Sequence, residues 1–397
     1  MKKILIIGQL PKEHGGNYTT GVANVIVNLL PFIPYDQFEK HLWASNIKKY
    51  SNKDIYNTKV YGINKYRLVF LFLSYFFKYP KRIITFKKYS KFGVKPLRNI
   101  IYEICIAKLI NKIKPDVIHV HNIGFLPAVH FANNKNNTNI LLTYHGVFYN
   151  DKYSIEQSLK KGIDIKKLFY NASQLINNFT VLTEQMKNDV VKYLNVKSNT
   201  IKVIPNGVGK GFYFNLKARL KLRKSLNYKD SDIVFISVGA LTKRKNHIGA
   251  INFLKSNFNN FKYLIVGRDG DYKEELLEII NNHDMIDLIP YVKNSELYKH
   301  YSASDYFIMP STQEGQSLVC LEAFASGLPV LINSDIKYTL GVPDFFSKYY
   351  VDVNLNIKNY KIPNNIKKIE RDKLSSLAIN NLGWSNSAKE YSKYYDN

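Results

Sequence analysis

The sequence is short of cysteines, acidic residues and long apolar runs. Its two cysteines, Cys105 and Cys320, allow at most one disulfide, and neither has the spacing of a metal-binding motif. We therefore expect a reduced, cytoplasmic protein rather than a disulfide-stabilised secreted one. The longest apolar stretch, LVFLFLSYFF at 68–77, is about half of the roughly 18 residues that a membrane-spanning helix needs. The apolar run in MKKILIIGQL is too short for an export signal and is typical of a first buried strand.

Acidic residues are few beside the basic ones: 31 Asp and Glu against 57 Lys and Arg, which gives a formal net charge of +26. Residues 60–115 alone contain thirteen Lys and Arg and one acid, Glu103, interleaved with many Tyr and Phe. Such a segment suits an anionic membrane, where each basic side chain contributes about 1 kcal/mol. Single-stranded nucleic acid is a second interpretation, and a composition rich in Lys, Asn, Ile and Tyr is a third. We favour an anionic membrane surface as the partner of residues 60–115 and expect no nucleic-acid partner.

A chain of 397 residues exceeds what one hydrophobic core usually supports, and its 45% hydrophobic content can fill two. Short continuous apolar runs alternate with helix-like stretches along the chain. The runs lie at 3–8, 116–121, 139–146, 179–183, 201–208, 232–241, 261–267, 287–292, 305–311 and 328–335. Continuous runs indicate parallel strands covered by helices on both faces. Two successive sets of them predict an α/β protein with two doubly wound, Rossmann-like domains.

The domain boundary is expected just after IPNGV at 204–208, because a charged stretch without strands follows it. We predict an N-terminal domain at 1–207, which contains the basic aromatic insert 60–115, and a second domain at 208–378. The remaining residues, 379–397, have the pattern of a helix with an apolar face. The sequence shows no internal repeat and no low-complexity tail.

Ligands of doubly wound sheets bind at the carboxyl ends of the strands, so the residues that follow each strand are informative. After the first strand, Gly15 and Gly16 precede a helix that begins near Thr19 or Thr20. Paired glycines let backbone N–H groups approach an anion at a helix start. An ordinary glycine turn explains the pair as well.

Histidines end two of the predicted strands. His145 follows the strand at 139–146 beside Gly146, and His119 and His121 lie at the end of the strand at 116–121. His145 is a candidate site residue, and His121 is a second candidate in the same region. The competing interpretation is that they are structural histidines.

A basic loop follows the strand at 232–241. It gathers Lys243, Arg244, Lys245 and His247 within five residues. Such a loop can clamp a diphosphate, with lysine acting as a point charge and arginine as a fork, and a solvated basic loop is the alternative. The acidic triplet at 230–232 comes before a strand rather than after one, so we interpret it as a loop and not as a metal site.

Two glutamates lie around a predicted helix start in STQEGQSLVCLEAFASG at 311–327. Glu314 lies in the loop, Ser317 is a candidate N-cap, and Glu322 lies inside the helix. The free N–H groups near Ser317 and Leu318 form an anion site. The two carboxylates are expected roughly 10 Å apart, which suits groups at opposite ends of a diphosphate. Acids that only complement a helix dipole are the alternative.

Taken together, these motifs resemble the retaining glycosyltransferases of family four, which have the GT-B fold. The resemblance rests on the E-x7-E spacing, EAFASGLPV, the VGALTKRKNH loop, the IPNGV hinge and the YHG strand end. It covers nearly the whole chain, is strongest from about 201 to 335, and is weaker in the basic insert and the C-terminal segment. It implies two Rossmann-like domains facing a central cleft, with the helix at 379–397 crossing back to the first domain.

The resemblance also implies a role for each matching position. Glu322 would hold the donor ribose, Glu314 the transferred sugar, and Lys245 the diphosphate leaving group. His145 would lie near the reacting sugar. The other implied donor-binding residues are Gly15, Gly16, Arg244, Gly315, Gln316, Ser317, Leu318 and Val292. One departure is Ala240, where the family often has an arginine; Arg244 and Lys243 are the candidate substitutes for that cation.

The implied reaction moves a sugar from a nucleotide-diphosphate sugar to a lipid-linked or cell-surface glycan, with retained anomeric configuration. The leaving phosphate would act as base, and neither glutamate is an assured nucleophile. No metal or other cofactor is expected, and the enzyme would lie peripherally on the inner face of the plasma membrane. A sugar-nucleotide epimerase of the same fold is an alternative. So is a non-enzymatic membrane or nucleic-acid binder, which leaves the strand-end motifs unexplained.

Overall fold

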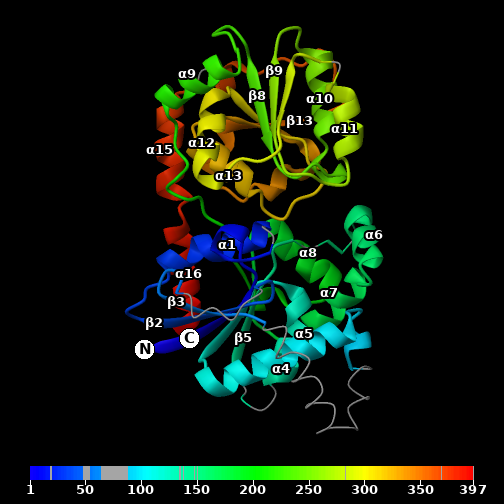
Figure 1. Cartoon of the computed structure of the whole chain (residues 1–397), viewed down its shortest axis with the longest axis vertical. Helices are drawn as coiled ribbons and strands as arrows, with labels where there is room; N and C mark the ends of the chain where they lie inside the picture. Colours follow the sequence, from blue (N-terminus) through cyan, green and yellow to red (C-terminus); the bar gives the residue numbers. More distant parts are fainter. Residues whose placement is uncertain are drawn as a thin grey trace. The chain divides into compact units, whose positions relative to one another are not determined.

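The computed structural model describes residues 1–17, 20–47, 54–63, 88–133, 136, 138–146, 148–149, 151–281, 283–367 and 369–396. The chain forms two compact units, Met1–Pro205 with Ser387–Asn397, and Asn206–Asn386 (Figure 1). The boundary between the units after Pro205 lies two residues before the predicted boundary after residue 207. Its cause is local: Val208 pairs with Gly383 in a parallel bridge, and the Val208 N–H donates to the Leu382 carbonyl at 2.7 Å, so residues 206–208 pack with the second unit.

The first unit contains a parallel sheet of seven described strands in the order β3-β2-β1-β4-β5-β6-β7. The strands are β1 (Lys2–Gly8), β2 (Phe38–Ala44), β3 (Thr58–Tyr61), β4 (Val117–Val120), β5 (Asn139–Thr143), β6 (Phe179–Val181) and β7 (Ile201–Val203). Its described α-helices are α1 (Gly21–Leu29), α4 (Pro96–Ile113), α5 (Leu126–Asn133), α6 (Lys152–Lys160), α7 (Ile165–Ser173), α8 (Glu184–Leu194) and the part of α16 (Trp384–Asp396) from Ser387 onward. The strand order reverses between β1 and β4, where such sheets bind ligands.

The second unit contains a parallel sheet of six described strands in the order β10-β9-β8-β11-β12-β13. The strands are β8 (Val234–Val238), β9 (Lys262–Val266), β10 (Ile286–Ile289), β11 (Tyr306–Met309), β12 (Val330–Asn333) and β13 (Tyr350–Val353). Its α-helices are α9 (Leu216–Ser225), α10 (His247–Asn257), α11 (Lys273–Ile280), α12 (Asn294–Ala303), α13 (Leu318–Ala325), α14 (Asn364–Lys367) and α15 (Arg371–Asn381). Here the order reverses between β8 and β11.

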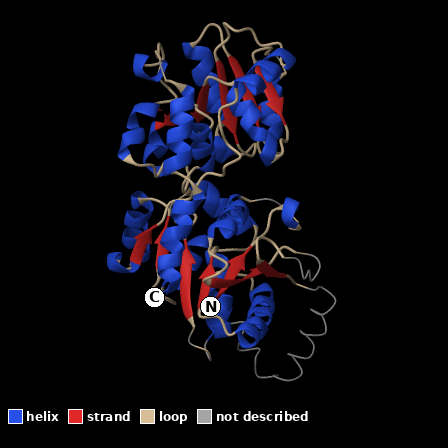
Figure 2. Cartoon of the chain, turned by 90° about the vertical axis from the view of Figure 1, so that its left-hand side faces the viewer, coloured by secondary structure: helices blue, strands red, loops and turns tan. Residues whose placement is uncertain are grey.

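In each unit the strands lie at the centre with helices around them (Figure 2). The central strands are apolar throughout because both faces of the sheet are covered. Ile4 to Ile7 of β1 and Val234 to Ile236 of β8 are almost completely buried. The ten apolar runs of the sequence correspond to ten of these strands, and β2, β3 and β13 were not predicted.

Helix α16 completes the first unit with aromatic side chains. Tyr391 and Tyr395 are buried, and the Tyr395 hydroxyl lies 2.7 Å from Nδ1 of His119 in β4. The ammonium of Lys2 in β1 donates to the Tyr395 carbonyl at 3.3 Å. Helix α16 therefore packs in the same core as strands β1 and β4.

The basic aromatic insert is only partly described, because residues 64–87 lie outside the described residues. In the part that is described, Tyr89 and Phe92 are buried in the core and Lys88 forms an ion pair with Glu103 at 2.8 Å. Tyr89 and Phe92 pack against Phe131 of α5, so these two aromatics of the insert do not lie on a surface that a membrane could contact. None of the described helices is long and apolar enough to cross a membrane.

Candidate functional site

The predicted acid and the predicted cations meet at the carboxyl ends of β8 and β11. Glu314 lies in the loop after β11, and one of its oxygens, Oε1, lies 2.7 Å from Nζ of Lys245 and 3.1 Å from a guanidinium nitrogen of Arg244. Arg244 also donates to the carbonyl of Gln313 at 2.6 Å. The short 3-10 turn Lys243–Lys245 that follows β8 carries both cations. The two loops meet because β8 and β11 are neighbours at the point where the strand order reverses.

The two cations fix the charge of Glu314. Its side chain is only 10% exposed, and burial alone would raise its pKa. The ammonium of Lys245 and the guanidinium of Arg244 outweigh burial and lower the pKa to about 2. Glu314 is therefore an ionised hydrogen-bond acceptor at neutral pH, and the three side chains together keep one positive charge.

Glu322 has the opposite environment. It lies in α13, partly buried, and accepts a hydrogen bond from the Tyr301 hydroxyl at 2.9 Å. Burial raises its pKa to about 7, against the lowering effect of the Tyr301 hydrogen bond and the more distant Lys245. Two acids with pKa values pushed apart in this way suit two different roles. No sequence pattern pointed to Tyr301, which reaches Glu322 from α12.

The N-cap side chain of α13 does not bond to the N–H groups at the start of the helix. Ser317 occupies the N-cap position, but its hydroxyl makes no capping hydrogen bond and lies 3.6 Å from the sulfur of Met309. The predicted N-cap position of Ser317 is therefore confirmed, but its hydroxyl turns toward β11 and does not cap the helix. The first N–H groups of a helix have no partner within the helix, so the backbone around Gly315 and Leu318 can donate to an anion.

The side chain of Gln316 is used by the protein itself. Its Oε1 accepts the N–H of Asn206 at 2.7 Å, and its Nε2 donates to the carbonyls of Leu340 and Gly341, both at 3.2 Å. Any contact of Gln316 with a donor would therefore come from its backbone. Val292, which follows β10, is partly buried against the core of the second unit.

The candidate substitutes for the cation missing at Ala240 have different surroundings. Arg244 holds Glu314, whereas Nζ of Lys243 lies 5.7 Å from the centre of the Tyr272 ring. His247 of the same loop is buried, with Nδ1 3.0 Å from the Ser237 hydroxyl, and belongs to the core. Of the two candidates, only Arg244 contacts Glu314, and its role as the substitute cation stays a prediction.

The two glycines of the first unit have structural reasons of their own. Gly15 has a φ of 95°, which favours glycine. A Cβ on Gly16 would lie 1.8 Å from the carbonyl oxygen of Leu10, so only glycine fits there. Asn46 holds the loop by bonding both the N–H and the carbonyl of Leu10, at 2.9 and 2.7 Å. The N–H groups of Gly15 and Gly16 donate within the turn, to the carbonyls of Lys12 and Pro11 at 3.0 Å each. The alternative of an ordinary glycine turn thus has direct support, and a donor-binding role of this loop stays a prediction.

The strand-end histidines lie together in the first unit. His145 is partly buried, and its Nε2 lies 3.1 Å from Nδ1 of His121. The rings of His121 and His119 are 4.0 Å apart between centroids. Burial lowers the pKa of His145 and of His119 to about 3, so these imidazoles are neutral at physiological pH.

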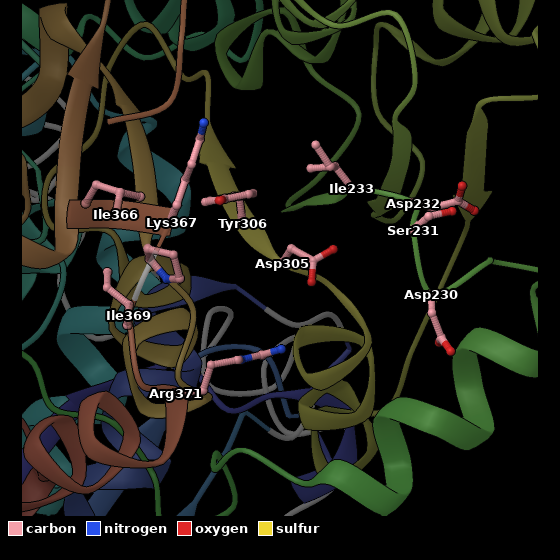
Figure 3. Close-up of a pocket in the computed structure, with 11 residues that line it drawn as sticks. Asp230, Ser231, Asp232, Ile233, Asp305, Tyr306, Ile366, Lys367, Ile369 and Arg371 are labelled. Atoms are coloured by element: carbon pink, nitrogen blue, oxygen red, sulfur yellow. The ribbon is translucent and has the colours of Figure 1, made fainter. Parts of the chain in front are cut away.

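The acidic triplet borders a different pocket, of about 290 Å³, at the amino ends of β8 and β11 (Figure 3). There Asp305 pairs with Arg219 at 2.7 Å, and Asp232 accepts the N–H of Lys229 at 2.8 Å. These carboxylates hold the chain that leads into β8, in agreement with the interpretation of 230–232 as a loop. Among the described residues, no group of three or more His, Cys, Asp or Glu side chains is arranged to hold a metal ion.

Comparison with known proteins finds several relatives. The chain is 28% identical over 172 residues to an uncharacterised glycosyltransferase of Methanocaldococcus jannaschii, covering 42% of this chain and 43% of the relative. It is 26% identical to the alpha-monoglucosyldiacylglycerol synthase of Acholeplasma laidlawii, covering 64% and 69%. It is also 26% identical to an Escherichia coli galactosyltransferase that acts on GlcNAc-diphosphoundecaprenol, covering 63% and 66%.

Solved structures with similar folds cover the whole chain. Sucrose-phosphate synthase from Thermosynechococcus elongatus matches with a TM-score of 0.72 at 16% identity, over 100% of this chain and 98% of that one. HepE of Anabaena, solved with UDP and glucose, matches with a TM-score of 0.69 at 14% identity, over 100% of both chains. At these identities the likeness concerns the fold.

Two family models match consecutive parts of the chain, Glycosyltransferase Family 4 at residues 20–212 and Glycosyl transferases group 1 at residues 218–380. Together with the relatives and the paired parallel sheets, they confirm the resemblance seen in the motifs. The chain belongs to the family-four glycosyltransferases of GT-B fold.

Proposed function

We propose that the protein transfers a sugar, with retention of anomeric configuration, from a nucleotide-diphosphate sugar to a lipid-linked or cell-surface glycan acceptor. The observation that carries the proposal is the cluster of Glu314, Lys245 and Arg244 beside the open start of α13. One relative is named as a synthase of a glucosylated diacylglycerol and another for galactosyl transfer to a diphosphoundecaprenol-linked sugar, and both names support the choice of acceptor class.

In this proposal the donor diphosphate lies between Lys245 and the N-terminus of α13. Lys245 and Arg244 bring two positive charges, and Glu314 cancels only one of them, so the resting cluster attracts an anion. The helix N–H groups add hydrogen bonds that strengthen as charge grows on the leaving phosphate. Lys245 and the helix start would thus supply the charge stabilisation, and we expect turnover to continue in the presence of a chelator.

Each glutamate has a distinct part. Glu322 would accept hydrogen bonds from the ribose hydroxyls. This suits a partly buried acid that also accepts a hydrogen bond from the Tyr301 hydroxyl. Glu314 would hold hydroxyls of the transferred sugar. Because two cations lower its pKa to about 2, Glu314 is a weak nucleophile, and this favours attack by the acceptor on the face from which the phosphate leaves.

The proposal extends to the place of the enzyme in the cell. An acceptor carried on a lipid would bring the protein to the inner face of the plasma membrane as a peripheral enzyme. The excess of basic residues supports this, since +26 net charge favours an anionic surface.

A panel of nucleotide sugars tests the proposal. The correct donor should raise the melting temperature by mass action, with about 2.7 kcal/mol of stabilisation at one hundred times its Kd. The same donor should be turned over only when a glycan acceptor is added, and NMR of the product should show the donor's anomeric configuration. Turnover without an acceptor would indicate an epimerase instead, and no stabilisation by any nucleotide sugar would contradict both.

A further inference from the structure

Three of the histidines in the first unit, His119, His121 and His145, lie in a row, and only His145 at one end is a candidate for contact with the sugar. His119 lies in β4, His121 directly after it, and His145 two residues after β5, so the parallel pairing of β4 with β5 brings them together. Ring centroids are 4.0 Å apart between His119 and His121 and 5.3 Å apart between His121 and His145. His119 and His121 are completely buried, whereas His145 is partly exposed.

The inner histidine is fully engaged. Nδ1 of His119 lies 2.7 Å from the Tyr395 hydroxyl, and its Nε2 lies 2.7 Å from the Thr143 hydroxyl. Hydroxyl groups can donate or accept, so either tautomer of His119 is satisfied. The hydrogen bonds of His119 therefore do not determine the tautomer of His121, and His119 supports the His121 ring only by packing.

The middle histidine has one hydrogen bond and one unused nitrogen. Nδ1 of His121 lies 3.1 Å from Nε2 of His145, and Nε2 of His121 is buried with no hydrogen-bond partner among the described residues. Both rings are neutral, because burial lowers the pKa of each well below its usual value. One proton is therefore shared between Nδ1 of His121 and Nε2 of His145, and only two arrangements exist.

The two arrangements leave different groups without a partner. If His145 donates from Nε2, the proton of His121 must lie on its own Nε2, and this buried N–H has no acceptor in the described part of the chain. If His121 donates from Nδ1, only a lone pair on its Nε2 is unmet. Buried N–H groups without a partner are rarer in proteins than acceptors with an unused lone pair, so the second arrangement is favoured. In that arrangement the single proton of His145 lies on Nδ1.

We propose that His121 is a positioning residue that holds the proton of His145 on Nδ1, so that His145 meets the transferred sugar as a hydrogen-bond donor and not as a base. The contact with the sugar rests on the proposed function, whereas the position of the proton does not. This assignment agrees with a reaction in which the leaving phosphate removes the acceptor proton, because a histidine that donates from Nδ1 and accepts at Nε2 has no free lone pair for the acceptor.

The proton can be located directly in the free protein. Selective labelling of histidine with ¹⁵N distinguishes a protonated ring nitrogen from a bare one at pH 7 by its chemical shift. We expect protonated Nδ1 and bare Nε2 in both His121 and His145, and a proton on Nε2 of His145 would overturn the proposal. No substrate is present in this measurement, so a failure of the proposed function would leave the result unchanged.

Two substitutions test whether His121 is the cause. His121→Asn keeps an N–H donor close to the position of Nδ1, and His121→Phe keeps the ring but removes the donor. The Asn variant should keep the His145 proton on Nδ1, and the Phe variant should move part of it to Nε2. His130→Phe, which changes a histidine outside the row, should leave the His145 signals as they are. An unchanged His145 tautomer in the Phe variant would contradict the role of His121.

Kinetics then separate positioning from packing. With donor and acceptor present, His121→Phe should lower kcat by about tenfold, the order of one misdirected hydrogen bond, with a smaller change in donor KM. His121→Asn should restore most of kcat although it packs less well than Phe. Equal losses in the two variants, or a loss that follows their melting temperatures, would show that His121 acts by packing alone.

Discussion

At the scale of single residues, Glu314 and Glu322 lie eight positions apart but differ in charge state. Glu314 touches two cations, and its pKa is lowered to about 2; Glu322 touches the Tyr301 hydroxyl, and burial raises its pKa to about 7. A pair of acids that served only the dipole of α13 would not need such different partners.

The two glutamates should therefore fail differently. Glu322→Gln should raise donor KM and change kcat little, because the ribose contact does not change during the reaction. Glu314→Gln should lower kcat by more than it raises KM, since this residue lies where charge and ring geometry change. Steady-state kinetics at saturating acceptor, with melting temperatures of both variants, measure the difference. Lower melting temperatures with unchanged kinetics would reduce both acids to structural roles, and reversed effects would exchange their assignments.

Lys245→Ala should suppress turnover more than it weakens donor binding. Negative charge grows on the diphosphate as the glycosidic bond breaks, so loss of one such contact costs about 3 kcal/mol, or roughly a hundredfold in kcat. Lys243→Ala is the matched control, because Lys243 lies over the Tyr272 ring and not at Glu314. Calorimetry measures donor binding, and single-turnover rates measure the transfer step. Equal single-turnover rates for the two variants would show that the phosphate site is assigned to the wrong residues.

The pH dependence of stability should report the buried acid. The pKa of Glu322 is raised in the folded state, so protonation of Glu322 stabilises the folded protein. This contribution to the free energy of unfolding is fully present below about pH 4.5 and is lost as pH rises through about 7. Glu322→Gln should then gain stability over the wild type between pH 5 and pH 8, on the order of 1–3 kcal/mol. Urea unfolding at the two pH values measures this, and a constant difference between wild type and variant would contradict the pKa shift.

At the scale of elements, the sequence predicted strands where apolar runs were continuous and missed them where they were not. β2 contains Lys40, which is buried because its ammonium donates to the carbonyls of Leu30 and Ile33 at 2.8 and 3.2 Å. Such a lysine breaks the apolar pattern, and no local signal reveals its partners. β3 and β13 lie at sheet edges, and each has an exposed charged residue, Lys59 or Asp352, that interrupts the apolar run.

The parts of the candidate site that follow strands could be predicted from the sequence, and the parts that depend on packing could not. Glu314 and Lys245 could be assigned to one region because both follow strands and neighbouring parallel strands end at one edge. Tyr301 could not be assigned, since it depends on how α12 packs beside α13. Nor could the engagement of Gln316, whose partners lie 110 and about 25 positions away in the chain.

Gln316 should be important for the shape of the donor loop. Gln316→Leu removes its hydrogen bonds to Asn206, Leu340 and Gly341 and leaves buried polar groups unpaired, each at a cost of about 1–3 kcal/mol. We expect a lower melting temperature and a raised donor KM, because the loop that carries Glu314 loses its support. Thr312→Ala, an exposed change in the same loop, is the control, and a variant as stable as the wild type would contradict this role.

At the scale of the whole molecule, the charge of +26 should govern association with membranes. The protein should bind vesicles with anionic lipid and be released in 1 M salt, where the screening length is roughly 3 Å. Gln substitutions at Lys78, Lys81, Arg82 and Lys87 should weaken this binding; Lys88 is left unchanged because it pairs with Glu103.

A matched set on another surface shows whether the effect is specific to the insert. Lys217, Lys221 and Lys224 of α9 are exposed, and their replacement by Gln removes a similar charge from the second unit. Cosedimentation with anionic and neutral vesicles compares the two variants. Equal binding to both kinds of vesicle, or equal loss in both variants, would remove the membrane assignment of residues 60–115.

The route of the chain between the units has a consequence for biosynthesis. Residues from Ser387 onward belong to the first unit, yet they leave the ribosome only after the entire second unit. Until then His119 lacks the Tyr395 hydroxyl and Thr143 lacks that of Tyr391. Domains generally fold in the order in which they are made, but here the earlier one must wait for its last helix. The second unit, whose residues are contiguous, can finish folding first, and a ribosome that stalls before residue 387 would release a protein whose first unit has an open core.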